Sequence, residues 1–306
     1  MRKLVLLCAM VFVVTAGPTH AQNILWVASN GSDANSCTQT APCATFAGAI
    51  QKGGVAQINC LSSGNYGVLN STTVSISGSI TIDCGTGNVG NIFSNGTAIS
   101  IDASSAVTVV LRHLSLNGLG TAANGITTPG FPSGSLTVED CTIQGNVGAG
   151  ISFIPSSGRG LLQVSNSQVI NNAFGITVQP VNGQIASVTL NRVEVAGNTV
   201  DGLSLIGPGV VAGTMRDSLV ASNGADGVQA SANQVFFTVE ESSIIANLSS
   251  GIHTTSAGSN LTVTASTIGA NGTGIKATAG SIVSFGNNSL NGNGSDGAFT
   301  STISLK

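Results

Sequence analysis

A repeat of about 25 residues runs from residue 107 to the end of the chain and most constrains its fold. Each copy holds short stretches of alternating apolar and polar residues, as in LTVEDCTIQGNVGAGISF from Leu136 and VTLNRVEVAGNTVDGLSL from Val188. An Asn recurs in each copy, at Asn117, Asn146, Asn172, Asn198, Asn223, Asn247, Asn271 and Asn293. A Gly and an apolar residue follow it, with the glycines at Gly125, Gly150, Gly175, Gly202, Gly227, Gly251, Gly274 and Gly297. A period of this length without a helical pattern indicates that each copy is one turn of a solenoid.

The alternation within each copy predicts three strands per turn, each with one buried face. In one copy, Val188 and Leu190 are expected to point into the core, and Thr189 and Ser204 away from it. Strands stacked in register form three parallel sheets around an apolar core, and the usual crossover preference makes the coil right-handed. The sequence therefore predicts an all-β fold, a right-handed parallel β-helix with three sheets and about ten turns.

The repeated Asn are expected to form a structural ladder rather than a catalytic row. The bend between the second and third strands is expected to need positive φ, which Asn and Gly tolerate. Stacked Asn side chains can also hydrogen-bond from one turn to the next. Asn247, Asn271 and Asn293 lie in glycosylation sequons, but side chains that face the ladder would be poor acceptors.

A second row lies between the two inward residues of each first strand, and its side chains should stack about 4.8 Å apart. Its expected members are Thr108, Thr137, Gln163, Thr189, Thr214, Thr238, Thr262 and Ser284. Such a row is typical of sheet surfaces, where β-branched residues and hydroxyl contacts are favourable. The alternative is a flat hydroxyl-lined face that binds sugar or ice.

The N-terminal segment differs from the repeats. Residues 1–21 have the basic start, apolar run and small-residue cleavage site of a signal peptide, with cleavage near Ala21. The protein is therefore expected to be secreted or periplasmic. Residues 22–60 are expected to form a cap and first strand, with a short helix near Ala44 to Gln51 covering the apolar end of the solenoid. Residues 61–306 are expected to form the repeats as a single domain.

Five of the six cysteines lie beyond the predicted signal peptide, in a compartment that permits disulfides. Cys37 and Cys43 bracket a short loop and form an obvious local pair. Cys60 and Cys84 end two strands 24 residues apart, which predicts a disulfide between adjacent turns. Cys141 is left over, and an odd count leaves a choice of partners.

Charge is scarce, since only 21 of the 306 residues are Lys, Arg, Asp or Glu. A mean hydropathy of +0.37 together with so few charges excludes a disordered chain. The formal net charge of -3 and the nine Lys and Arg exclude a protein that tracks nucleic-acid phosphates. No stretch is apolar for long enough to predict a membrane span.

The opening WVASNGSDANSC, followed by APCATFAGAI and then GNYG after a strand, resembles the entry of secreted proteins of the pectin-lyase-like superfamily. The Asn-ladder repeats resemble the right-handed β-helix repeats of that superfamily. The resemblance implies the fold but leaves the activity open, because the superfamily includes pectate lyases, polygalacturonases, alginate-related enzymes, tailspikes and non-catalytic surface proteins. The Asp cluster, GHG and RIK motifs of polygalacturonase-like hydrolysis do not occur: Asp201 in NTVDG stands alone, and His253 lies in GIHT.

One charged stripe lies in the predicted turn between the first and second strands of each copy. It comprises Glu139, Asp140, Arg192, Arg216, Asp217, Glu240 and Glu241. Pectate-lyase-like elimination needs a basic residue to take a sugar-ring proton and Ca²⁺ held by carboxylates against the uronate. The candidate catalytic residues are accordingly Arg192, Arg216, Asp217, Glu240 and Glu241, and the alternative is an exposed ion-pair ladder.

Gln229, His253 and Lys276 follow the Gly-apolar step on three consecutive turns and should stack as a candidate binding row. A His beside a Lys is a possible base near neutral pH, although an outward polar position is more often simply solvated. Arg112 and His113 form a further pair on an earlier turn.

The sequence therefore favours an exported β-helix with a carbohydrate-binding or extracellular structural role. The alternative is a polysaccharide lyase or hydrolase that acts on an extracellular polysaccharide. Short loops and the single Trp and single Tyr argue against a deep sugar-binding cleft. No cofactor or metal is expected, except Ca²⁺ under the lyase alternative, and the oligomeric state is left open.

Overall fold

The computed structural model describes residues 23–67, 73–85 and 87–304. Within this part of the chain the strands form three sheets, with twelve, ten and ten strands. The predicted signal peptide, residues 1–21, lies outside the described residues.

The first sheet consists of β1 (Asn23–Val27), β2 (Val55–Cys60), β5 (Ile80–Asp83), β8 (Val107–Arg112), β11 (Gly134–Glu139), β14 (Arg159–Ser165), β17 (Ile185–Asn191), β20 (Val210–Arg216), β23 (Gln234–Glu240), β26 (Ser259–Thr264), β29 (Ser281–Ser284) and β32 (Ser301–Thr302). The second sheet consists of β3 (Gly64–Asn65), β6 (Gly90–Phe93), β9 (Leu114–Ala122), β12 (Thr142–Asn146), β15 (Gln168–Ile170), β18 (Glu194–Ala196), β21 (Leu219–Ala221), β24 (Ser243–Ile245), β27 (Thr267–Gly269) and β30 (Ser289–Asn291). The third sheet consists of β4 (Val74–Ile76), β7 (Ile99–Ile101), β10 (Ile126–Phe131), β13 (Ala149–Pro155), β16 (Phe174–Val178), β19 (Leu203–Leu205), β22 (Val228–Ala230), β25 (Ser250–Thr254), β28 (Thr273–Ala277) and β31 (Ser295–Gly297).

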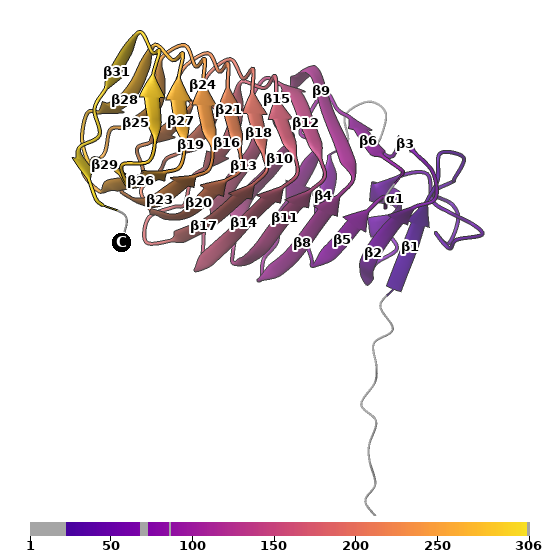
Figure 1. Ribbon diagram of the computed structural model, residues 1–306. Helices are drawn as coiled ribbons and strands as arrows, with labels where there is room; N and C mark the ends of the chain where they lie inside the picture. The colour runs from indigo at the N-terminus through magenta and orange to yellow at the C-terminus, as the bar shows by residue number, and fades with distance from the viewer. Residues whose placement is uncertain (1–22, 68–72, 86, 305–306) are drawn as a thin grey trace, which may run out of the picture.

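The chain visits the three sheets in turn, so that strands β2 to β31 form ten turns of three strands. Neighbouring strands in each sheet are parallel and one turn apart in the sequence, as β17 and β20 are. The coil runs from the cap around α1 to β31 (Figure 1). The predicted three-sheet parallel β-helix is therefore confirmed. We call the bend from the first sheet to the second the first bend, and the bend from the second sheet to the third the second bend. The third bend leads from the third sheet back to the first.

The core follows the predicted alternation. Val188 and Leu190 are fully buried between the sheets, while Thr189 is exposed. Burying an apolar side chain of this size contributes roughly 1.5–3 kcal/mol, and every turn repeats this burial. Ser204 differs from the prediction of an outward, solvated side chain: it is buried, because its hydroxyl donates to the Asp201 carboxylate at 3.0 Å.

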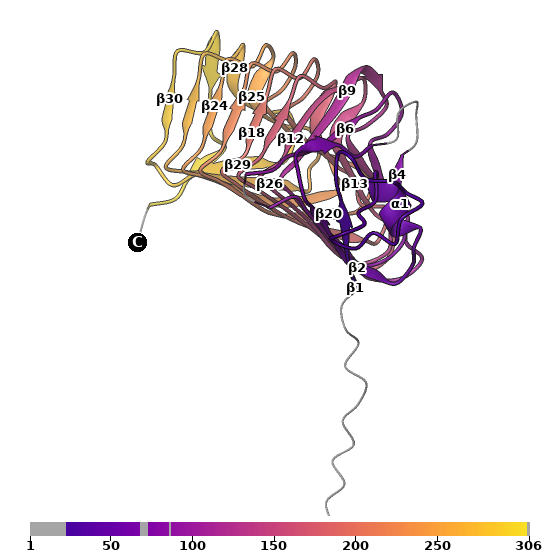
Figure 2. The same ribbon diagram turned by 90° about the vertical axis from the view of Figure 1, so that its right-hand side faces the viewer.

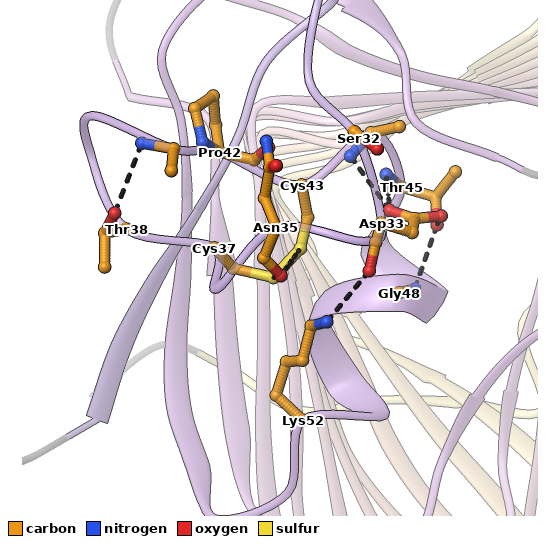
Figure 3. Close-up of a disulfide and its surroundings, with 12 residues drawn as sticks. Ser32, Asp33, Asn35, Cys37, Thr38, Pro42, Cys43, Thr45, Gly48 and Lys52 are labelled. Atoms are coloured by element: carbon orange, nitrogen blue, oxygen red, sulfur yellow. Dashed lines mark hydrogen bonds between the residues drawn. A yellow bond between two sulfur atoms is a disulfide. The ribbon is translucent and has the colours of Figure 1, made fainter.

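The cap closes the N-terminal end of the solenoid (Figure 2). Its helix α1 (Phe46–Ile50) lies within the predicted Ala44–Gln51 segment and buries Phe46 against Tyr66, with ring centroids 5.2 Å apart. Thr45 caps the helix by accepting the Gly48 N–H at 2.9 Å. Asp33 binds the backbone N–H groups of Ala44 and Thr45 and so fixes the loop before the helix (Figure 3).

Both predicted disulfides are present. Cys37 and Cys43 close the cap loop (Figure 3), and Cys60 and Cys84 join adjacent turns of the first sheet. Cys141 is a free, buried thiol. Within the described residues no helix has the length and apolar character that spanning a membrane requires.

The Asn ladder runs along the second bend. From each turn, the backbone N–H and side-chain amide both donate to the Asn Oδ1 of the next turn, as from Asn198 to Asn223 at 3.1 and 2.9 Å. The hydrogen-bonded members are Asn146, Asn172, Asn198, Asn223, Asn247, Asn271 and Asn293. Asn117 was predicted to belong and does not, because the nine-residue strand β9 places Ala122 opposite Asn146.

The positive φ of the second bend falls one residue earlier than predicted. Asn171, Ser222 and Ala246 have φ of 55°, 54° and 57° and directly precede ladder Asn residues. The Asn residues themselves are therefore selected for their amide groups rather than for left-handed backbone.

A second ladder, which the sequence analysis missed, lines the first bend. Buried Ser167, Ser218, Ser242 and Ser266 each accept a backbone N–H from the preceding turn. Each Ser hydroxyl also donates to the carbonyl two residues before it, as Ser167 does to Ser165. Cys141 occupies the same position one turn earlier, and its thiol lies 3.2 Å from the Glu139 carbonyl. The odd cysteine is thus a ladder member rather than a disulfide partner.

Candidate functional site

The outward side of the first sheet carries the predicted hydroxyl row. Thr137, Gln163, Thr189, Thr214, Thr238 and Thr262 are direct cross-strand neighbours. The prediction that Thr108 and Ser284 belong to this row was wrong, because Val110 and Val283 occupy the row position on β8 and β29. The β8 error is a two-residue offset, which keeps side chains on the same face and is invisible to an alternation pattern.

The sheet is wider than this one row. Its neighbouring strands β17, β20, β23 and β26 (Figure 1) present three adjacent outward rows, which we call the β17–β26 face. One row is Ser187, Ala212, Phe236 and Asn260; the next is Thr189, Thr214, Thr238 and Thr262; the third is Asn191, Arg216, Glu240 and Thr264. Phe236 is 52% exposed, while its neighbour Phe237 is buried in the core.

The charged stripe overlaps the edge of this face, because Arg216 and Glu240 end strands β20 and β23 at the first bend. Arg216 donates to the Glu241 carboxylate from Nη2 at 2.8 Å and from Nε at 3.0 Å. Its Nε also lies 3.6 Å from Asp217 Oδ2. The pKa of Arg216 is raised, mainly by the hydrogen bond to Glu241 and by the negative charge of Glu241. The charges of Glu240 and Asp217 contribute less. An Arg held in this way is a poor general base, because the carboxylates stabilise its protonated form.

Arg192, one turn earlier, donates from Nε to Asn166 Oδ1 at 2.7 Å. A shallow depression separates Arg192 and Asn191 from Arg216, between strands β17 and β20. The structure thus brings the five candidate catalytic residues onto three successive turns. Their catalytic role stays a prediction.

The stripe does not fit a divalent cation. Glu241 is bound by the Arg216 guanidinium, and a Ca²⁺ site requires several carboxylate or carbonyl oxygens that are free to converge. Among the described residues, no three or more His, Cys, Asp or Glu side chains are grouped in a way that could hold a metal ion. The Arg112–His113 pair is also engaged, with Arg112 bound to Glu139 and His113 to Asp83, each at 2.7 Å.

The candidate binding row lies on the third sheet. Gln229, His253 and Lys276 are in register on β22, β25 and β28. His253 is not simply solvated: its Nδ1 lies 2.7 Å from Asp226 Oδ2, and its Nε2 lies 3.0 Å from the Thr278 hydroxyl.

Sequence reasoning missed Asp226, which lies one turn after Asp201. Asp201 therefore does not stand alone, because its Oδ1 accepts the backbone N–H of Asp226 at 3.1 Å. Burial raises the pKa of Asp201. Burial also disfavours the charged form of Asp226, but hydrogen bonds from Ser249, His253 and the Ser250 backbone lower its pKa overall. The repeated Asp-Gly step at residues 201 and 226 was the signal in the sequence.

Comparison with known proteins supports the architecture. The family described as right handed beta helix region matches residues 210–304. The pectate lyase Pel9A structure has 17% sequence identity and a TM-score of 0.64, covering 86% of this chain and 74% of that one. The A-module of Azotobacter vinelandii mannuronan C-5 epimerase AlgE6 has 12% identity and a TM-score of 0.39, covering 90% of this chain and 94% of that one. No curated protein matches the chain by sequence.

The family match and the pectate lyase structure both support the same fold. The chain is a right-handed parallel β-helix and shares this fold with the pectate lyase structure. At 17% identity the likeness extends to the fold alone.

Proposed function

We propose that the protein binds an extended extracellular polysaccharide on the β17–β26 face. The observation that carries this proposal is the adjacency of three different in-register rows, one containing the exposed Phe236, one of hydroxyls, and one of amide and charged groups. A sugar ring presents C–H surface as well as hydroxyls, so recognition needs an apolar patch beside hydrogen-bond donors and acceptors.

The spacing of the face suits a polymer rather than a single sugar. Neighbouring strands lie about 4.8 Å apart, so the same contact recurs along the axis of the solenoid. The depression between Arg192 and Arg216 adds charged donors at the margin of the hydroxyl row. The pectate lyase that shares the fold acts on a polysaccharide, which is compatible with this substrate class.

A binding assay on a polysaccharide panel tests the proposal. A chain without residues 1–21 is expected to bind at least one neutral or acidic polysaccharide in affinity electrophoresis. Phe236→Ala should weaken that binding about tenfold, which corresponds to about 1.4 kcal/mol. Thr214→Val, which removes one hydroxyl from the middle of the row, should weaken it by a smaller factor.

Phe93→Ala is the matched control, because Phe93 is also exposed but lies on β6 of the second sheet. It should bind as the unmodified protein does. Failure to bind any polysaccharide would reject the proposal in favour of an extracellular structural role. Equal losses in Phe93→Ala and Phe236→Ala would place the binding elsewhere.

A further inference from the structure

A hydroxyl, an imidazole and a carboxylate form a continuous chain across three successive turns of the third sheet. Asp226 lies in the bend before β22, His253 on β25, and Thr278 directly after β28. His253 Nδ1 is 2.7 Å from Asp226 Oδ2, and His253 Nε2 is 3.0 Å from Thr278 Oγ1. Both distances lie within the range that a nucleophile and its base require.

The surroundings of Asp226 fix the role of each group. Asp226 is 5% exposed, and its other oxygen accepts the Ser250 N–H at 2.8 Å, so the carboxylate is held in one orientation. An ionised Asp226 accepts the proton of His253 Nδ1. His253 Nε2 then carries the lone pair and accepts the Thr278 hydroxyl proton.

We propose that Thr278, His253 and Asp226 act as nucleophile, general base and positioning carboxylate in the hydrolysis of carboxylic esters. Thr278 Oγ1 attacks the ester carbonyl carbon, and its proton moves to His253 Nε2. The tetrahedral intermediate then breaks its bond to the alkoxy oxygen, which leaves as the alcohol with the proton from His253.

Water completes the reaction. It gives one proton to His253 Nε2 while its oxygen adds to the acyl carbon, and the acid leaves as Thr278 Oγ1 recovers that proton. Asp226 keeps its charge throughout and stabilises the imidazolium that forms in each half of the cycle.

Lys276 is the residue suited to stabilise the negative charge of the tetrahedral intermediate. It lies opposite His253 on the neighbouring strand, and its side chain is exposed. The backbone N–H groups of Thr278 and Ala279 are not available for that role, because both donate to the Thr254 carbonyl. Since Thr278 is itself exposed, the site suits an ester group that projects from a larger molecule, such as an acyl substituent on a polymer, rather than a substrate that must be enclosed.

The experiment uses p-nitrophenyl acetate as the probe and mass spectrometry to locate the acyl group. The protein should release p-nitrophenol above the buffer rate and carry acetate on Thr278 after rapid acid quenching. Thr278→Val and His253→Gln should each lower the rate by about 100-fold or more. Thr278→Ser should retain it, which distinguishes a lost nucleophile from a lost fold.

Thr199→Val is the matched control, since Thr199 is an exposed threonine on an earlier turn. Its rate should equal that of the unmodified protein. A rate equal to the buffer blank would overturn the proposal, and so would acetate found on Lys276 with an unchanged rate in Thr278→Val.

Discussion

The Asn ladder makes a sharp prediction, because Asn198 and Asn117 occupy the same place in the sequence motif but differ in the structure. Asn198 Oδ1 accepts from the backbone N–H and side-chain amide of Asn172 at 3.0 and 3.2 Å. Its own amide donates to the Val169 carbonyl at 3.3 Å and to Asn223 at 2.9 Å. Asn117 instead accepts one bond, from the nearby Leu119 N–H at 2.9 Å.

Asn198→Ala removes all four of these bonds in a buried bend and leaves the Asn172 N–H without its partner. An orphaned buried donor costs about 1–3 kcal/mol, and the remaining bonds contribute about 0.5–1.5 kcal/mol each. These contributions total roughly 2.5–7.5 kcal/mol, so the free energy of unfolding should fall by at least about 2.5 kcal/mol. Asn117→Ala loses one exposed hydrogen bond and should cost about 0.5–1.5 kcal/mol.

Urea denaturation followed by far-ultraviolet circular dichroism measures both changes. Midpoints should be compared at a common slope, because long solenoids do not unfold in a strict two-state manner. If Asn198→Ala and Asn117→Ala destabilised the protein to within about 0.5 kcal/mol of each other, the ladder hydrogen bonds would not be a distinct source of stability.

Four further predictions concern the cysteines and one buried carboxylate. Cys141→Ser should change the free energy of unfolding by less than about 1 kcal/mol, because serine fills this position on later turns. Burial raises the pKa of the Cys141 thiol to about 12, so a thiol reagent should label it only in urea. Replacing Cys60 and Cys84 together by Ala should cost about 3.5 kcal/mol, the loop-closure entropy of the 24-residue separation, measured by urea midpoint. Asp226 has a pKa below its ordinary 3.8, so its ionised form stabilises the fold above that pH and the contribution is lost as pH falls further. Asp226→Asn should therefore lose less stability than the unmodified protein when urea midpoints are compared from about pH 5 to about pH 2.5.

The sequence predicted those features that depend on a repeated residue type. The Asn ladder from Asn146 onward and the Cys60–Cys84 disulfide followed from spacing, because strands stacked in register bring equivalent positions together. The Cys37–Cys43 disulfide followed from the short loop that the two residues bracket. The prediction for Asn117 was wrong because β9 is longer than the other strands of its sheet, and a sequence motif does not show where an extra residue is accommodated.

The candidate sites were harder to predict because they depend on which face a residue occupies. Phe236 and Phe237 are adjacent and chemically identical, yet one is half-exposed and the other is buried. His253 was identified, but its partners Asp226 and Thr278 lie 27 and 25 residues away on other turns. Such pairs become visible only once the register between turns is known.

The two ladders also decide where this fold can change during evolution. Asn198 lies six positions after Arg192, and Asn223 lies six positions after Asp217, so the segment between the first and second bends has a fixed length. The full turn measured along the ladder nevertheless shortens from 26 to 22 residues towards the C-terminus. Most of that variation falls at the third bend, where the connection between sheets is six residues after β16 and three after β22. The third bend is therefore the place where an insertion can lengthen a loop, and build a wall or a lid beside the outer faces, without breaking either ladder.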